Sequence, residues 1–153
     1  MSSPLTVLQP GLALVGWTFV MQAWMHATRL PAMSKYKVNV RPNMTKEDMN
    51  VIPPSIRWKG DNYNHLHEQP TLFYAVIGAL AITSLNNKQG ATLGNADLDM
   101  GLEVGLAWTY VGLRVVHSLV QSTANPIMVR FGIFLLSSAS LLGMTARAMS
   151  YVF

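Results

Sequence analysis

Four long apolar segments limit the folds that this chain can adopt. They cover residues 5–29, 61–87, 99–121 and 126–152, and a membrane-spanning helix needs roughly 20 mostly apolar residues. The second segment reaches that length only if its polar beginning is helical too. Only 12% of the residues are charged, which leaves too few to coat a soluble four-helix bundle. The sequence therefore predicts a single all-α domain over residues 1–153, an integral membrane four-helix bundle.

The connection over residues 30–60 is long, rich in proline and basic. Seven of the eleven Lys and Arg residues fall between positions 29 and 59. Such a basic stretch also occurs in proteins that bind nucleic acid, but here it lies between two apolar segments. The positive-inside rule then predicts a multi-pass protein whose first loop faces the cytoplasm or the mitochondrial matrix. The sequence leaves open whether the membrane is of endoplasmic reticulum type or the mitochondrial inner membrane. We expect a lipid bilayer as a partner and no nucleic acid.

A polar block, residues 61–69, leads directly into the second apolar segment. It contains asparagines, histidines and a glutamate, and polar groups in a membrane usually face the bundle interior or a ligand. Four antiparallel spans bring this block to the same leaflet as the end of the third segment and the beginning of the fourth. The sequence therefore predicts a pocket beside the basic loop. Its ionisable candidates are His26, His65, His67, Glu68, Arg114, His117 and Arg130.

The spacing of these residues places several of them on shared helix faces. Arg114, His117 and Gln121 share one face of the third helix, and Asn64 and Glu68 are four residues apart in the second. Arginine binds carboxylates and glutamate binds ammonium groups, so a zwitterionic, peptide-like ligand would fit. The alternative is that Glu68 and Arg114 only neutralise each other inside the bundle. Spacing alone leaves both possibilities open.

Metal chemistry has little support in this sequence. There is no cysteine, and the two histidines of the polar block, His65 and His67, fall on different faces of a helix. No HExxH motif occurs. Haem bound through His26, His65 or His117 is the weaker alternative, and we expect no metal site.

Two further features indicate helix packing. Gly101 and Gly105 form a GxxxG motif that lets helix backbones approach closely, within the chain or between chains. Glu103 and Arg147 are expected near the leaflet opposite the basic loop. We interpret them as a structural ion pair.

Two motifs resemble the MAPEG family, the membrane-associated proteins in eicosanoid and glutathione metabolism. Residues 62–74 read NYNHLHEQPTLFY. They resemble the signature Asn-aromatic-x-Asn-Leu-Phe-Glu-x-Pro-x-Leu-Phe-Tyr of the bacterial-type branch. Residues 114–121 read RVVHSLVQ and are followed by Arg130, as in the family's Arg-x-x-His motif with a later arginine. The resemblance covers about residues 5–150.

The resemblance implies a homotrimer of four-helix subunits that binds glutathione, as co-substrate, between neighbouring subunits. By position, Glu68 would hold the amino end of the tripeptide, with Asn64 beside it. Arg114, His117 and Arg130 would line the thiol and carboxylate region. A cation such as Arg130 favours the nucleophilic thiolate, which makes it the catalytic candidate. The function implied is a glutathione-dependent transferase or peroxidase that acts on lipophilic small molecules.

Several positions differ from active eukaryotic members of the family. Asp61 and Asn64 occupy places where those transferases carry basic residues, and His65 replaces an asparagine. Gln121 stands where a tyrosine is expected and cannot ionise. These differences favour the alternative function, a non-catalytic accessory or scaffold subunit of a larger membrane complex. A small transporter or channel is a third possibility, but no repeat or broken-helix signature supports it.

Overall fold

The regular structure of the chain is helical throughout the part that the structure describes. The computed structural model describes residues 4–92 and 100–152. A short 3-10 turn and a long helix come first, and the connection that follows holds another 3-10 turn and a short helix. Three long helices complete the chain. In order, the elements are η1 (Pro4–Val7), α1 (Leu8–Lys35), η2 (Glu47–Val51), α2 (Pro54–His65), α3 (Pro70–Thr92), α4 (Gly101–Thr123) and α5 (Ile127–Val152).

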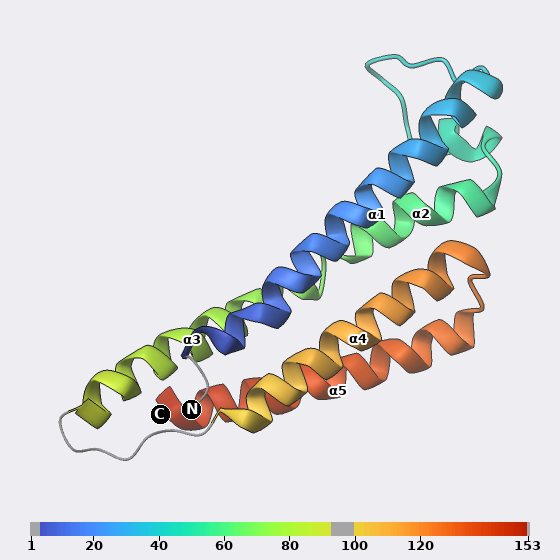
Figure 1. Ribbon diagram of the computed structural model, residues 1–153. Helices are drawn as coiled ribbons and strands as arrows, with labels where there is room; N and C mark the ends of the chain where they lie inside the picture. The colour runs from blue at the N-terminus through green and yellow to red at the C-terminus, as the bar shows by residue number, and fades with distance from the viewer. Residues whose placement is uncertain (1–3, 93–99, 153) are drawn as a thin grey trace.

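The helices form two packed antiparallel pairs (Figure 1). α2 and α3 follow each other along α1, whereas α4 runs beside α5. The two chain termini lie at one end of the bundle. The first connection, η2 and the α4–α5 turn lie at the other end, which we call the loop end.

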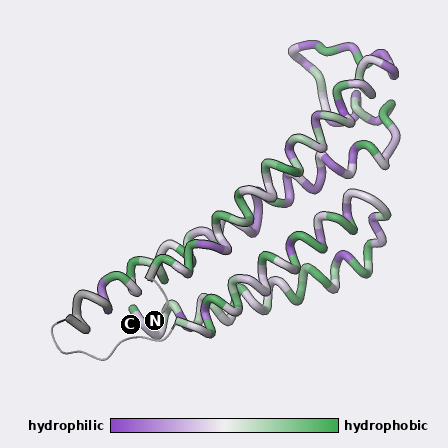
Figure 2. Tube along the Cα trace, in the orientation of Figure 1, coloured by the Kyte–Doolittle hydropathy of each residue, from purple (hydrophilic) through white to green (hydrophobic). Residues whose placement is uncertain are grey.

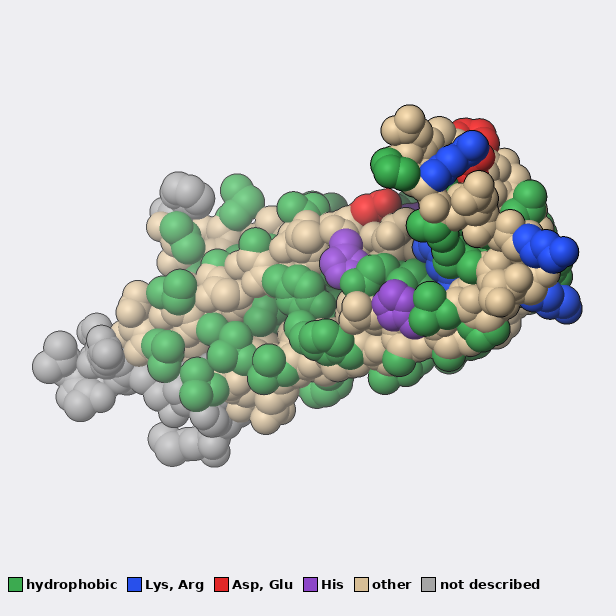
Figure 3. All heavy atoms as spheres, turned by 90° about the horizontal axis from the view of Figure 1, so that it is seen from above, with side chains coloured by type: hydrophobic (Ala, Val, Ile, Leu, Met, Phe, Trp, Pro, Cys, Tyr) green, Lys and Arg blue, Asp and Glu red, His purple; other side chains and the backbone are tan. Residues whose placement is uncertain are grey.

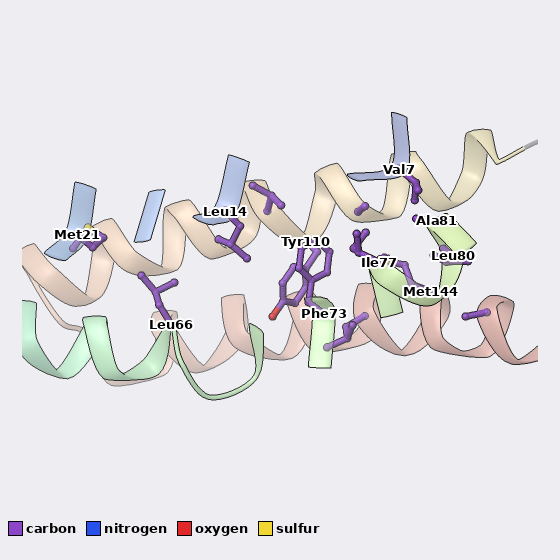
Figure 4. Packing of buried hydrophobic residues seen from close by; sticks show 14 residues of the cluster. Val7, Leu14, Met21, Leu66, Phe73, Ile77, Leu80, Ala81, Tyr110 and Met144 are labelled. Atoms are coloured by element: carbon purple, nitrogen blue, oxygen red, sulfur yellow. The ribbon is translucent and has the colours of Figure 1, made fainter. Parts of the chain in front are cut away.

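Apolar side chains hold the two pairs together. Leu14 and Met21 of α1 are fully buried against the other helices, as is Met144 of α5. At the centre the rings of Phe73 and Tyr110 stack with centroids 4.4 Å apart (Figure 4). Such burial is the main favourable term that holds helices together in an aqueous setting. In lipid, close packing takes over that role.

The outward faces of two segments are also apolar, as lipid contact requires. Leu5–Lys35 and Ile127–Val152 are long and apolar enough to cross a membrane. Only 28% and 22% of their most hydrophobic windows are buried in the chain, whereas a core helix of a soluble protein would be mostly buried. Figure 2 shows hydrophobic residues along the bundle and hydrophilic ones gathered at the loop end.

The predicted helix over residues 61–87 is two helices in the structure. α2 ends at His65, four residues form a turn, and α3 begins at Pro70. Proline has no N–H and disfavours helical geometry in the residue before it, so the chain breaks there. Asn64 and Glu68 therefore do not share a helix face, contrary to expectation.

The first helix is longer than the predicted 5–29. α1 continues through Pro31 to Lys35, and Pro31 is exposed. A proline removes one backbone hydrogen bond, and here the bonds of the surrounding turns are enough to continue the helix. The predicted loop over residues 30–60 consequently contains the end of α1, η2 and the first half of α2. α4 and α5 begin and end within two residues of the predicted bounds.

Gly105 and Gly112 of α4 do not contact other helices closely among the described residues. A Cβ added at Gly105 or at Gly112 would meet no atom within 4 Å. Both residues are exposed. The small-residue surface of α4 thus faces outward.

An ion pair ties the beginning of α4 to the end of α5. Arg147 Nε donates to Glu103 Oε1 at 2.6 Å, and the Tyr151 hydroxyl donates to the same oxygen at 2.6 Å. The Glu103 side chain is fully buried, whereas that of Arg147 is 43% exposed. The predicted pairing of these two residues therefore occurs, at the end of the bundle opposite the loop end.

Removing the cation of this pair is expected to destabilise the bundle more than removing the anion. Arg147→Gln leaves a buried carboxylate with only the Tyr151 hydroxyl as partner, whereas Glu103→Gln leaves a cation that can reach solvent. Thermal unfolding in detergent, followed by circular dichroism, should show the larger drop in melting temperature for Arg147→Gln. The double variant should recover part of that loss. Arg41→Gln, which breaks the exposed pair with Asp48, is the control and should have little effect. An equal drop for Glu103→Gln and Arg147→Gln would contradict this interpretation.

Candidate functional site

One face of α4 carries polar side chains into the bundle interior. The helical spacing places five of them in a row, and the packing of α4 against the other helices buries all five. Polar burial of this extent is costly and is usually retained for function in a membrane protein. We call this row the polar stripe; it consists of Arg114, His117, Ser118, Gln121 and Ser122.

Arg114 is the most deeply placed charge in the stripe, with only 1% of its surface exposed. Its Nε donates to the Tyr110 hydroxyl at 3.1 Å, and its Nη2 donates to Gln69 Oε1. The guanidinium also lies over the rings of Tyr110 and Phe134, 5.3 Å and 5.2 Å from their centroids. All of these partners are neutral. No carboxylate of the described residues lies within ion-pair distance of Arg114.

Gln69 fixes the beginning of α3 against both helices of the other pair. Besides accepting from Arg114, it donates from Nε2 to Ser138 Oγ of α5 at 2.7 Å. Ser138 in turn donates to the backbone carbonyl of Phe134 at 2.8 Å. The turn between α2 and α3 is thereby held next to the polar stripe.

His117 gathers several of the predicted site residues around it. Its ring centroid lies 5.7 Å from that of His65, and Phe134 stands beside both imidazoles at 6.4 Å and 6.5 Å. Arg114, His65 and Arg130 are all close enough to act on His117 electrostatically. The structure therefore brings residues from α2, α4 and α5 into one region near the loop end.

Arg130 is positioned by the turn between α4 and α5. Asn125 ends the turn with φ of 51°, a left-handed conformation that asparagine tolerates better than most residues. Its side-chain oxygen accepts a hydrogen bond of 2.7 Å from Arg130 Nη1. A half-buried guanidinium is thus held at the loop end with donors left for a ligand.

Glu68 does not reach Arg114 within the chain. Its side chain is 63% exposed in the turn between α2 and α3, and it pairs with His65 Nδ1 at 3.4 Å. The alternative in which Glu68 and Arg114 neutralise each other inside one bundle is therefore wrong. Asn64 also lies apart, because it lines a separate cavity of about 270 Å³ between α1, η2 and α2.

Several buried polar atoms near the stripe lack partners. Asn62 of α2 is fully buried, and neither its amide oxygen nor its amide nitrogen has a hydrogen-bond partner among the described residues. The same holds for Ser118 Oγ, Gln121 Oε1 and Ser122 Oγ. Unpaired buried polar groups usually mark ordered water or a ligand. The polar interior thus extends beyond the arginine and the histidine.

Sequence reasoning missed three residues that shape this region. Gln69 and Asn62 belong to the polar block, and their amide side chains were a usable signal. Phe134 lies inside an apolar segment, where nothing in the pattern separates it from its neighbours. No cluster of three or more His, Asp or Glu side chains that would hold a metal occurs in residues 4–92 and 100–152.

A known family model matches most of the chain, including the helices that carry the polar stripe. The model of the MAPEG family matches residues 7–150. The chain belongs to the MAPEG family. The match includes α1, α3, α4 and nearly all of α5, and the family's membrane four-helix bundle agrees with the fold. The predicted membership of the MAPEG family is confirmed, whereas the bacterial-type branch stays a prediction. Comparison with curated proteins and with solved structures gives no match.

In this MAPEG protein, the predicted site residues occupy different surroundings. Arg114 and His117 are buried in the polar stripe, and Arg130 is half-buried beside them. Glu68 is exposed at the turn, and Asn64 faces the separate cavity. Within one subunit, therefore, the predicted site residues do not all lie in a single site.

Proposed function

We propose that this MAPEG protein binds glutathione near the loop end and acts as a glutathione-dependent transferase or peroxidase on lipophilic electrophiles. The observation that carries the proposal is the Arg114 guanidinium, which is 1% exposed and has only neutral partners among the residues that the structure describes. A buried cation without an anion is costly, so its presence indicates that an anion arrives from outside the subunit. A carboxylate of glutathione has the required charge and shape.

The remaining charges fit the rest of the tripeptide. Glu68 offers an exposed carboxylate to the ligand's ammonium group. Arg130 supplies a half-buried cation that lowers the pKa of the glutathione thiol and so favours the thiolate. In a transfer reaction the thiolate sulfur forms a bond to the electrophilic carbon while the leaving group departs with its electron pair. The thiol proton passes to solvent.

In the peroxidase reaction the same thiolate attacks the distal oxygen of a lipid hydroperoxide. The O–O bond breaks and the alkoxide takes up a proton to form the alcohol. A second glutathione then reduces the sulfenic acid and yields water and glutathione disulfide. Both reactions need the thiolate, which is why Arg130 is assigned the catalytic role in each.

A site shared between subunits explains why Glu68 and Arg114 stay apart. Glu68 is exposed on one subunit, and the outward glycine surface of α4 leaves room for a neighbouring helix. We therefore propose a homotrimer in which glutathione lies between neighbours. The helices cross the membrane several times, with the basic loop end on the cytoplasmic or matrix side.

A specific observation favours a second function, that of a non-catalytic accessory subunit. Arg114 already donates to Tyr110 and Gln69, and Gln121 offers no ionisable group to the ligand. A bundle of this kind would keep the fold of the family and use its polar interior only for its own stability. Its partners would then be the other subunits of a membrane complex.

Titration calorimetry on the protein in lipid nanodiscs separates the two functions. Glutathione should bind saturably, and an added aromatic electrophile should be conjugated at a rate well above the uncatalysed one. Ophthalmic acid, which replaces the thiol by a methyl group, is the matched control and should bind without turnover. Absence of glutathione binding, or binding without conjugation and without peroxide reduction, would favour the accessory subunit.

A further inference from the structure

A cavity lies at the loop end, apart from the polar stripe. The cavity has a volume of about 270 Å³ and lies between the end of α1, η2 and α2. Its floor is apolar, with Met49, Ile52 and Ile56, and Ile52 is fully buried. Its charged lining consists of Arg29, Lys46, Glu47, Arg57 and Asp61. Figure 3 shows charged side chains gathered at this end of the molecule.

Arg57 of α2 has donor capacity that the chain does not use. Its Nη1 donates to Asn50 Oδ1, which orients the guanidinium along the cavity wall. Its Nε is buried and has no hydrogen-bond partner among the described residues. A buried guanidinium N–H without an acceptor is unfavourable unless a ligand or water supplies one.

Arg29 of α1 also lines the cavity. Its Nη1 is 3.7 Å from the point where a Cβ on Gly60 would stand, so the guanidinium extends across α2. No described residue forms an ion pair with it. Two half-buried guanidinium groups therefore face the same cavity from different helices.

The acidic residues of the lining do not neutralise these arginines. Glu47 and Asp61 are exposed at the rim, whereas Arg29 and Arg57 are half-buried. A hydrogen bond from its own backbone N–H, supported by Thr45, lowers the pKa of Glu47. With Lys46 included, the cavity carries three cations and two carboxylates, a net charge of +1.

We propose that this cavity binds a phosphate group, either on the headgroup of a lipid or on a soluble phosphate compound. Phosphate accepts bidentate hydrogen bonds from guanidinium groups, and two arginines with Lys46 match its charge. The apolar floor and the place at the loop end suit a headgroup at the membrane surface, where basic residues attract anionic lipids. The site is independent of the proposed glutathione function, because none of its cations belongs to the polar stripe.

Titration calorimetry in a phosphate-free maltoside detergent tests the site. One arm uses inorganic phosphate, and the other uses short-chain phosphatidylglycerol. Arg29→Gln and Arg57→Gln should each weaken binding about tenfold or more. Lys35→Gln removes an exposed cation outside the cavity lining and should leave affinity within about twofold of wild type.

Each outcome of this experiment either identifies the ligand of the cavity or overturns the proposal. Binding of inorganic phosphate with the expected pattern assigns a soluble phosphate compound, and binding of the lipid alone assigns a headgroup. The proposal is overturned if neither probe binds, or if Lys35→Gln weakens binding as much as the arginine variants. It is also overturned if glutathione displaces the bound phosphate and if Arg57→Gln weakens glutathione binding as much as it weakens phosphate binding. If Arg57→Gln unfolds, Arg57→Lys keeps the charge and should bind phosphate with an intermediate affinity.

Discussion

Replacing Arg130 with alanine is expected to lower the rate of glutathione conjugation about 100-fold or more. Arg130 is held half-buried by Asn125 and lies near His117, where the thiol of a bound tripeptide is proposed to sit. Without this cation the thiol keeps its ordinary pKa, so less thiolate is present at neutral pH. Initial rates measured over a pH series should begin to rise at a higher pH in the variant than in the wild type.

Two matched variants control this prediction. Arg130→Lys keeps the positive charge and should retain part of the activity. Arg41→Ala removes a cation that pairs with Asp48 in the exposed loop, and it should leave the rate unchanged. If Arg130→Ala conjugates glutathione at the wild-type rate, Arg130 has no catalytic role.

Arg114→Met is expected to weaken glutathione binding without destabilising the fold. The guanidinium is buried and its partners in the described part of the chain are all neutral, so its removal relieves a desolvation cost, and methionine fills much of the same volume. Calorimetry should show glutathione affinity reduced about tenfold or more. The melting temperature in detergent should stay the same or rise, as is common when a functional residue is replaced.

The contrast with Arg147 makes this second prediction specific. Arg147 has a buried carboxylate partner, Glu103, and its loss should lower the melting temperature. Arg114 has none among the described residues. A marked loss of stability in Arg114→Met would show that this arginine is a structural residue and would favour the accessory function.

Local sequence patterns predicted those parts of the fold that depend on neighbouring residues. The bounds of α4 and α5 follow from long apolar runs, and they agree with the structure within two residues. The pairing of Glu103 with Arg147 followed from their depth in the bundle. The apolar and polar pattern of residues 61–87 predicts one continuous helix, and it does not reveal the break between α2 and α3 that Pro70 causes.

Site geometry was harder to predict because it depends on side-chain directions across helices. The position of Glu68 follows from the turn that precedes α3, and this turn points the carboxylate outward, away from Arg114. The cavity lined by Arg29 and Arg57 arises from how α2 folds back on α1. No spacing within either helix encodes that contact.

The sequence by itself determined the family, the all-α membrane bundle and the gathering of polar residues at one end. These properties follow from composition, from apolar length and from motifs that lie within single helices. Only the tertiary structure decided which of those polar residues meet. It left the buried Arg114 without an anion among the described residues and placed Arg29 and Arg57 around one cavity, because the packing of distant helices selects the partners of each charge.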